Sequence, residues 1–263
     1  MTFETIRIDS SPQGVARLTL ARGDKHNAIN LQMIRDLRQA AETLGAEPSI
    51  RVVVLAGDGR SFCAGADLGW MEEQTTKDRS ARLAEAMELA QMLRALDGLP
   101  KPLIARVHGP AYGGGVGLMA VCDVVIAADT AKFALTEVRL GLIPATIGPF
   151  ILRRIAEREA RRFMLNATIM DASVALAAGL VSTVVPGDQL DAAVEAEVAA
   201  FLACAPGAVS AAKALFQHLA RHPEGDQLAW SADQLAQRWE TAEAIEGLAC
   251  FFERREPSWR RKP

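Results

Sequence analysis

The chain has 263 residues, of which 50% are hydrophobic and 23% are charged, and its formal net charge is −3. This composition is typical of a globular protein with a large buried core. The near-neutral charge argues against the basic surface of a nucleic-acid-binding protein, so no nucleic-acid partner is expected.

The first two-thirds of the chain alternates short apolar runs with helical patterns. Asn30 is placed to cap a helix whose apolar residues recur at helical spacing, and a polar helix is expected over residues 78–96. This alternation predicts an α/β fold built from βα units. The expected strands span residues 15–20, 51–56, 103–107 and 123–127.

The last third of the chain has a different pattern. Asp171 is placed to cap a helix that Gly179 ends. From about Asp188 onward the sequence is rich in Ala and Leu and almost wholly helical in pattern. We therefore expect an α/β core over residues 1–195 and a C-terminal helical region over residues 196–263.

Cysteine usage and apolar stretches indicate the compartment. Four widely separated cysteines without a C-x-x-C pair predict buried, reduced thiols in a cytoplasmic protein. The first ten residues carry acidic side chains and no apolar segment, so no signal peptide is expected. The apolar stretch 110–128 holds four glycines and Asp123, which argues against a membrane span. The histidines show no zinc-type spacing, so no metal is expected.

Three segments carry residues suited to chemistry. Small residues in segment 61–68 (SFCAGADL) would let a ligand approach the backbone closely. Segment 109–118 (GPAYGGGVGL) places glycine N–H groups at a helix N-terminus, which favours negative charge. In segment 133–145 (FALTEVRLGLIPA), apolar neighbours would raise the pKa of Glu137 towards neutrality. Taken singly, each segment is weak evidence. Segment 61–68 could be an ordinary strand-to-helix turn, and Glu137 could form an ion pair with Arg139 or another surface charge.

In their order and spacing, the three segments resemble those of the enoyl-CoA hydratase/isomerase (crotonase) family. The likeness extends from N-A-I-N at 27–30 to A-x-x-x-G-L-V at 175–181. It implies an α/β crotonase-type spiral of ββα units, with a C-terminal helical region that supports homotrimers or dimers of trimers. It also implies an acyl-CoA thioester substrate and no cofactor apart from the coenzyme A that the substrate carries.

The resemblance also assigns roles to individual residues. Ala66 and Gly114 fall where the backbone N–H groups of the family form an oxyanion hole, which stabilises charge on the thioester carbonyl oxygen. Glu137 falls at a catalytic acid/base position. The substrate-binding candidates are Ala64, Asp67 and Leu68 around the adenine and pantetheine, Lys25 at a phosphate, Tyr112 beside Glu137, and Arg139 at the acyl group.

One departure from the family pattern bears on the mechanism. Hydratases with two catalytic glutamates carry the first in the glycine-rich helix, where this chain has Gly117, whereas the second is retained as Glu137. The resemblance therefore implies that Glu137 is the principal acid/base. Tyr112, Glu72 and Glu73 are left open as polar groups that could assist it.

The acyl group is predicted from a closer likeness. Gly117, the E-V-R-x-G-L-x-P-A segment and residues 246–259 most resemble bacterial methylglutaconyl-CoA hydratases, which act on 3-methylglutaconyl-CoA in leucine degradation. Arg139 offers a bidentate partner for the free carboxylate of that acyl group. The alternatives are an isohexenylglutaconyl-CoA hydratase of acyclic terpene degradation, an enoyl-CoA delta-isomerase, and a non-catalytic acyl-CoA-binding scaffold.

Overall fold

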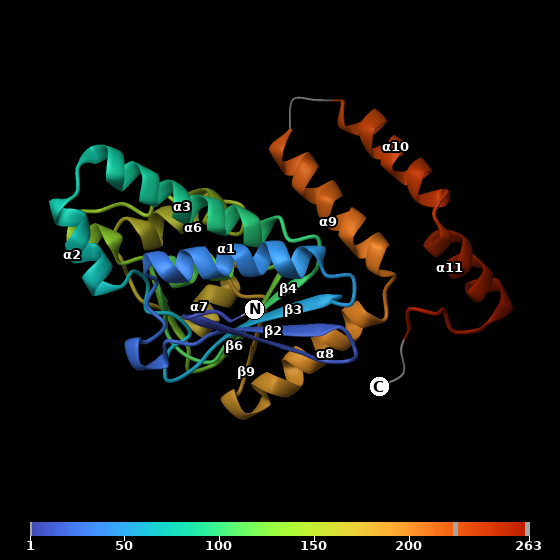
Figure 1. Cartoon of the computed structure of the whole chain (residues 1–263), viewed down its shortest axis with the longest axis horizontal. Coiled ribbons are helices and arrows are strands. Elements are labelled where there is room, and N and C mark those ends of the chain that lie inside the picture. The colour runs from blue at the N-terminus through green and yellow to red at the C-terminus, as the bar shows by residue number, and fades with distance from the viewer. Residues whose placement is uncertain (1, 223–225, 261–263) are drawn as a thin grey trace.

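The computed structural model describes residues 2–222 and 226–260. Within these residues the strands form a six-stranded and a three-stranded sheet (Figure 1). The strands are β1 (Ile6–Ser10), β2 (Val15–Leu20), β3 (Val52–Gly57), β4 (Leu103–Val107), β5 (Ala111–Tyr112), β6 (Val124–Ala128), β7 (Lys132–Ala134), β8 (Met170–Asp171) and β9 (Thr183–Val185). The larger sheet has the order β1-β2-β3-β4-β6-β9 and the smaller one the order β5-β7-β8.

The predicted helix caps are confirmed. The side chain of Asn30 accepts a hydrogen bond from the N–H of Met33 at 2.9 Å, and that of Asp171 accepts one from Val174 at the same distance. The helices are α1 (Leu31–Ala46), α2 (Leu68–Thr76), α3 (Arg79–Asp97), α4 (Gly114–Ala120), α5 (Gly148–Ile151), α6 (Glu157–Met164), α7 (Ala172–Ala177), α8 (Leu190–Leu202), α9 (Pro206–Arg221), α10 (Gln227–Trp239) and α11 (Ala242–Glu253), with 3-10 turns at Gly23–Lys25, Glu137–Leu140 and Gly187–Gln189.

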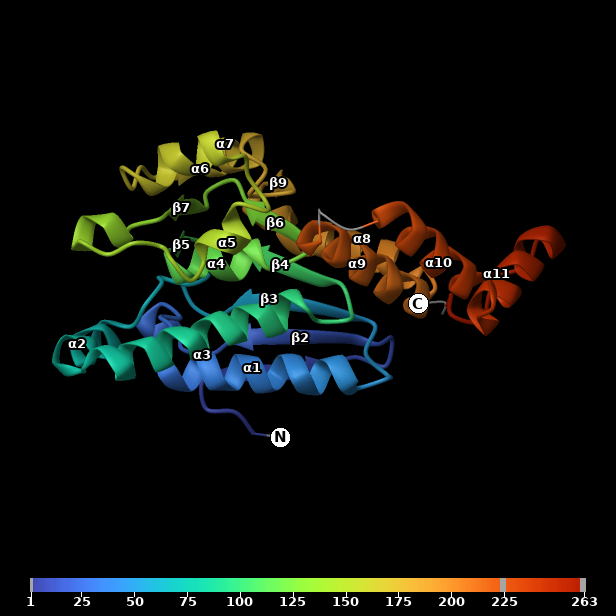
Figure 2. The same cartoon turned by 90° about the horizontal axis from the view of Figure 1, so that it is seen from above.

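The central strands of the larger sheet are buried on both faces. β1 runs antiparallel to β2, whereas β2, β3, β4, β6 and β9 run parallel. Val53 and Leu55 belong to the core beneath α1 and α3, which lie side by side along one face (Figure 2). Val52 and Val54 point to the other face and pack with Val194 of α8. Because successive side chains alternate between two covered faces, β3 reads in the sequence as one continuous apolar run.

The second sheet continues the winding of the chain. A parallel bridge joins Cys63 to Ala111 of β5, β5 runs parallel to β7, and β7 runs antiparallel to β8. Cys63, β5 and β7 each follow a strand of the larger sheet in the sequence, and β8 precedes the last strand of that sheet, β9. The chain therefore forms a spiral in which successive turns contribute to both sheets.

The C-terminal helices extend away from the sheets. α8 packs on the larger sheet, whereas α9, α10 and α11 reach outward in both views (Figures 1 and 2). Arg51, just before β3, fixes the start of this region, because its guanidinium donates to the carbonyl oxygens of Leu202 at 2.9 Å and Cys204 at 2.8 Å. The expected division at residue 195 stays a prediction, and it falls within α8.

The cysteines differ from expectation at one position. Cys63, Cys122 and Cys250 are buried and unpaired, but Cys204 is exposed, so the prediction of four buried thiols was wrong there. Cys204 lies in the turn that joins α8 to α9, where the chain leaves the sheet. Burial raises the pKa of the Cys63 and Cys122 thiols to about 12, so neither is a nucleophile at neutral pH.

No single helix in residues 2–222 and 226–260 is long and apolar enough to cross a membrane. By length and composition, Gly187–Leu202 and Pro206–Arg221 pass the same criterion as a pair, and the chain bends by 100° between them.

Candidate active site

The structure brings the three chemistry-bearing segments to the wall of one cavity of about 350 Å³. Segment 61–68 arrives from β3, the glycine-rich loop leads from β5 into α4, and the Glu137–Leu140 turn follows β7. Parts of α2 and α3 and the residues before α5 complete the lining. The predicted site residues that line this cavity are Ala64, Ala66, Leu68, Gly114 and Glu137.

Asp67 and Arg139 do not line the cavity but make structural contacts beside it. The Asp67 carboxylate accepts hydrogen bonds from the N–H groups that open α2 and from Arg22 at 2.8 Å. Arg139 is exposed, and its guanidinium donates to the carbonyl oxygen of Ala167 at 2.7 Å. The guanidinium predicted to bind an acyl carboxylate is therefore already bonded elsewhere in the chain.

Lys25 and Tyr112 also lie outside the lining. Lys25 is exposed on the Gly23–Lys25 turn, next to His26, whose carbonyl oxygen accepts from the N–H of Ala64 at 2.9 Å. That bond places Lys25 close to the loop that forms the cavity wall. Tyr112 lies in β5, where its N–H donates to Cys63 at 2.9 Å.

Glycine allows the two loops of the cavity to pack backbone against backbone. Gly65 has a φ of +93°, and a Cβ there would lie 2.9 Å from the carbonyl oxygen of Tyr112. A Cβ on Gly115 would overlap the carbonyl oxygen of Cys63. Since neither position has room for a side chain, the close approach of the loops depends on both glycines.

Two main-chain donors at the cavity wall remain without acceptors. The N–H of Ala66 donates to no protein acceptor in the described part of the chain, although both neighbours of Ala66 are bonded to Ile29. Gly114 opens α4, and its N–H likewise has no acceptor among residues 2–222 and 226–260. Both residues line the cavity, so two free donors are available to a bound group.

Asn27 holds the loop that leads to Ala66. It is fully buried with a φ of +54°, a conformation that Asn tolerates better than most residues. Its side-chain nitrogen donates to the carbonyl oxygens of Asp58, Ser61 and Phe62 at 2.8 to 3.1 Å. Its side-chain oxygen accepts from the N–H of Arg22 at 3.0 Å. The sequence patterns marked this residue only as part of a family likeness and missed its supporting role.

Glu137 supplies a titratable group to the cavity. Its Oε2 is buried without a hydrogen-bond partner among the described residues. Burial, which disfavours the charged form, raises the pKa of this carboxyl above its usual value. The carboxylate lies against the glycine-rich loop, since a Cβ on Gly113 would sit 3.1 Å from Oε1. The arrangement suits proton transfer next to the start of α4.

Glu137 is the only carboxylic acid among the described residues that line the cavity. Glu72 and Glu73, which were left open as assistants, are exposed on α2 and do not line it. Gly117 is buried within α4. The site therefore combines one acid/base with two free main-chain donors.

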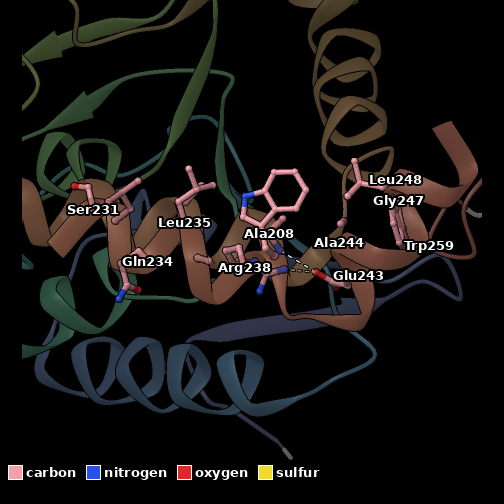
Figure 3. A pocket seen from close by; sticks show the side chains of 15 residues that line it. Ala208, Ser231, Gln234, Leu235, Arg238, Glu243, Ala244, Gly247, Leu248 and Trp259 are labelled. Atoms are coloured by element: carbon pink, nitrogen blue, oxygen red, sulfur yellow. Dashed lines mark hydrogen bonds and ion pairs between the residues drawn. The ribbon is translucent and has the colours of Figure 1, made fainter. Parts of the chain in front are cut away.

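A larger cavity lies elsewhere and lacks this chemistry. It measures about 500 Å³ and lies between α9, α10 and α11 (Figure 3). Its lining includes Leu235 and Leu248, and its Glu243 is engaged by Arg238 at 2.8 Å. None of the predicted site residues lines it. In the described part of the chain, no three His, Cys, Asp or Glu residues are grouped as a metal ion would require.

The chain thus forms a spiral of two sheets that holds a cavity with one acid and two free main-chain amides, and comparison with known proteins identifies the class of protein. A model of the enoyl-CoA hydratase/isomerase family matches residues 10–262, so the chain belongs to this family. The predicted crotonase fold is confirmed, and so is the class of enzyme, an enoyl-CoA hydratase-type carbon–oxygen lyase.

The relatives cover nearly the whole chain. The 2,3-dehydroadipyl-CoA hydratase of Escherichia coli is 34% identical over 255 residues, which span 96% of this chain and 98% of that protein. An enoyl-CoA hydratase from Shewanella pealeana superposes with a TM-score of 0.93 at 37% identity, covering 98% of this chain and 96% of its own. AtuE of Pseudomonas aeruginosa superposes with a TM-score of 0.94 at 36% identity, covering 98% and 100%.

Proposed function

We propose that the protein adds water across the double bond of an enoyl-CoA thioester, with Glu137 as acid/base and the N–H groups of Ala66 and Gly114 as the oxyanion donors. One observation carries the proposal. A buried, unpaired carboxylate oxygen shares a cavity with two main-chain N–H groups that have no acceptor in the described chain. A thioester whose carbonyl oxygen accepts from both donors would place its acyl group in the cavity with Glu137.

The chemistry follows from where charge develops. As the oxygen of water bonds to the β-carbon, electrons move through the double bond to the thioester oxygen, where the two donors stabilise the enolate. Glu137 takes the proton that water loses and returns it to the α-carbon, so one water is added in total. Removing one such donor in other enzymes costs about 3–4 kcal/mol of transition-state stabilisation.

We propose that the rest of the coenzyme lies along the loop outside the cavity. Ala64 lines the cavity, and Leu68 is 82% exposed at its edge, which gives the pantetheine an apolar surface. Lys25 is exposed beside this loop and is proposed to contact a phosphate. Asp67 supports the loop through Arg22 and the start of α2. No cofactor beyond the substrate's coenzyme A is required.

The proposed acyl group is 3-methylglutaconyl, as in leucine degradation. Its support is the sequence pattern around Glu137 and over residues 246–259. The described lining holds no Lys or Arg, and burying an unpaired carboxylate is unfavourable. The free carboxylate of this substrate would therefore have to lie at the open end of the cavity. Kinetics with 3-methylglutaconyl-CoA, isohexenylglutaconyl-CoA and crotonyl-CoA would compare the acyl groups directly.

The first prediction concerns the acid/base. Glu137→Gln keeps the shape of the side chain but cannot accept the proton from water. We expect turnover to fall at least about a hundredfold while coenzyme A binding is largely unchanged. The control Glu195→Gln changes an exposed carboxylate on α8 and should match the wild type. Near-normal turnover of the Glu137 variant would remove this residue from the mechanism.

A second activity is favoured because the lining holds no second acid among the residues that the structure describes. A delta-isomerase moves a proton with a single acid/base and adds no water. Incubation in heavy-oxygen water separates the two reactions, because only hydration places solvent oxygen in the product. Binding of enoyl-CoA without any product would instead support a non-catalytic scaffold.

We also propose that the chain assembles as a homotrimer or a dimer of trimers in the cytoplasm. The support is a row of apolar side chains that one chain leaves uncovered on α10 and α11. These include Leu228 at 85%, Trp239 at 59%, Phe251 at 77% and Phe252 at 76% exposure.

A further inference from the structure

A buried glycine and an isoleucine fit together at the inner wall of the cavity. Gly117 is buried in α4, and a Cβ built on it would overlap Cγ2 of Ile147 and lie 3.0 Å from the Ile147 Cβ. Ile147 is 2% exposed and lines the cavity. Its side chain therefore fills the space that any side chain at position 117 would need. An acid cannot be accommodated at position 117 while Ile147 stays in place.

The attacking water then needs a second polar partner from another part of the wall. Apart from Glu137, the side chains of the described lining that carry polar atoms are Trp70, Gln74, Thr136 and Thr146. The indole N–H of Trp70 and the side-chain nitrogen of Gln74 both donate to Glu85, at 2.7 Å and 2.6 Å, so both side chains are held towards α3. The hydroxyls of Thr136 and Thr146 have no protein partner in the described residues, so both are free to bind a water.

Thr146 lies on the segment before α5, whose Ile147 side chain fills the space that a side chain at position 117 would need. It directly precedes Ile147, whose side chain packs on Gly117. Two backbone bonds fix the segment on either side, from Ala145 to Ile143 and from Gly148 to Pro144, both at 2.8 Å. Thr146 therefore lines the cavity one residue away from the contact between Ile147 and α4.

We infer that Thr146 is the water-positioning residue of this site: its hydroxyl holds the attacking water for Glu137, in place of an acid at position 117. The inference rests on the proposed hydration. Thr146 accepts or donates one hydrogen bond and exchanges no proton, so the water's proton still goes to Glu137 and from there to the α-carbon. The water oxygen forms the new bond to the β-carbon.

Thr136 provides the matched comparison. It also lines the cavity with a free hydroxyl, but it immediately precedes Glu137 at the start of the 3-10 turn and is remote in sequence from the Ile147 contact. Thr→Val replaces a hydroxyl by a methyl of similar size. The same change at both positions therefore separates the loss of the Thr146 hydroxyl from a general effect on the lining.

The experiment measures two reactions of the full-length protein. Hydration is followed with crotonyl-CoA and 3-methylglutaconyl-CoA, and enolate formation is followed as exchange of the α-protons of butyryl-CoA in heavy water. For Thr146→Val we expect the kcat of hydration to fall at least about tenfold with KM within about twofold, while α-proton exchange stays within about twofold of the wild type. Thr146→Ser, which retains a hydroxyl, should recover most of the hydration, and Thr136→Val should resemble the wild type.

Other results would overturn the inference. Normal hydration by Thr146→Val would show that its hydroxyl holds no water. An equal loss of hydration and exchange would show that Thr146 only maintains the shape of the site, and so would failure of Thr146→Ser to recover activity. A comparable loss in Thr136→Val would assign the water to that residue instead. If the wild type exchanges α-protons but hydrates neither substrate, the proposed hydration fails and the inference fails with it.

Discussion

At the scale of single residues, the environment of Glu137 determines how the reaction depends on pH. Burial raises the pKa of this carboxyl above its usual value of 4.5. The carboxylate must be ionised to take a proton from water. We therefore expect kcat/KM to rise with pH through a pKa above that of an ordinary glutamate, which a pH–rate profile with crotonyl-CoA would show. An acid limb at or below 4.5 would contradict the raised pKa.

The same burial links Glu137 to stability. Because the folded state holds the proton more tightly than the unfolded state, the contribution of protonated Glu137 is complete below the unfolded pKa. It is lost as pH rises through the raised folded pKa. Glu137→Gln keeps a neutral side chain, so its stability relative to the wild type should increase between about pH 4, below the unfolded pKa, and about pH 8. Denaturant unfolding at both pH values would measure this, and a constant difference would argue against burial as the cause.

At the scale of residues, the sequence predicted which residues line the cavity better than it predicted the partners that their side chains bind. Glu137, Ala66 and Gly114, which the family resemblance assigned to one site, line the same cavity. Arg139 was chosen for its charge, but sequence position alone cannot show that its guanidinium bonds to Ala167. No local sequence pattern identifies Thr146. Its proposed role follows from the contact between its neighbour Ile147 and Gly117 in α4, which only the structure shows.

At the scale of elements, α4 and the segment before α5 are coupled through Gly117 and Ile147. Gly117→Ala places a methyl group where Cγ2 of Ile147 lies, so overpacking should lower the free energy of unfolding by about 1–3 kcal/mol. Adding Ile147→Ala removes Cγ2, the atom in the closest conflict, and leaves only the Cβ of residue 147. A double-mutant cycle should then give a coupling energy of about 1 kcal/mol or more between the two positions.

A second glycine serves as the control for that cycle. A Cβ on Gly148 would meet its nearest atom, on Met164, only at an ordinary 3.8 Å. Gly148→Ala should therefore change stability much less than Gly117→Ala, as measured by denaturant unfolding. Additive effects of the Gly117 and Ile147 substitutions would mean that the two residues relax independently.

Elements with a strong local pattern were the predictable ones. The apolar run of β3 and the Asn30 cap of α1 identified their elements directly. β1 was missed because only Ile6 of its five residues is buried, so the strand has little apolar alternation. α6 was missed because it is short and mostly charged: of its eight residues only Ala160 and Phe163 are buried. Mostly exposed elements leave a weak hydrophobic signal.

At the scale of the whole molecule, the uncovered apolar side chains of α10 and α11 predict assembly. We expect the wild type to sediment at three or six times the 28.2 kDa of one chain. Phe251→Glu would place a charge in the proposed interface, because Phe251 is 77% exposed in one chain, and should shift the protein towards smaller species. Leu83→Glu, at a 54% exposed position on α3, is the control and should leave the assembly unchanged. A monomeric wild type would refute the proposed trimer.

The pairing of the two loops at the cavity has one more consequence. Because the proposed donors are backbone groups of Ala66 and Gly114, ordinary side-chain replacement cannot delete them; only proline lacks the hydrogen. Side-chain changes at positions 66 and 114 would thus leave the proposed donors in place, whereas the proposed acyl end, lined by residues 140, 142–144, 146 and 147, is open to point mutation. Related proteins could then come to accept different acyl groups while the thioester carbonyl is bound in the same way.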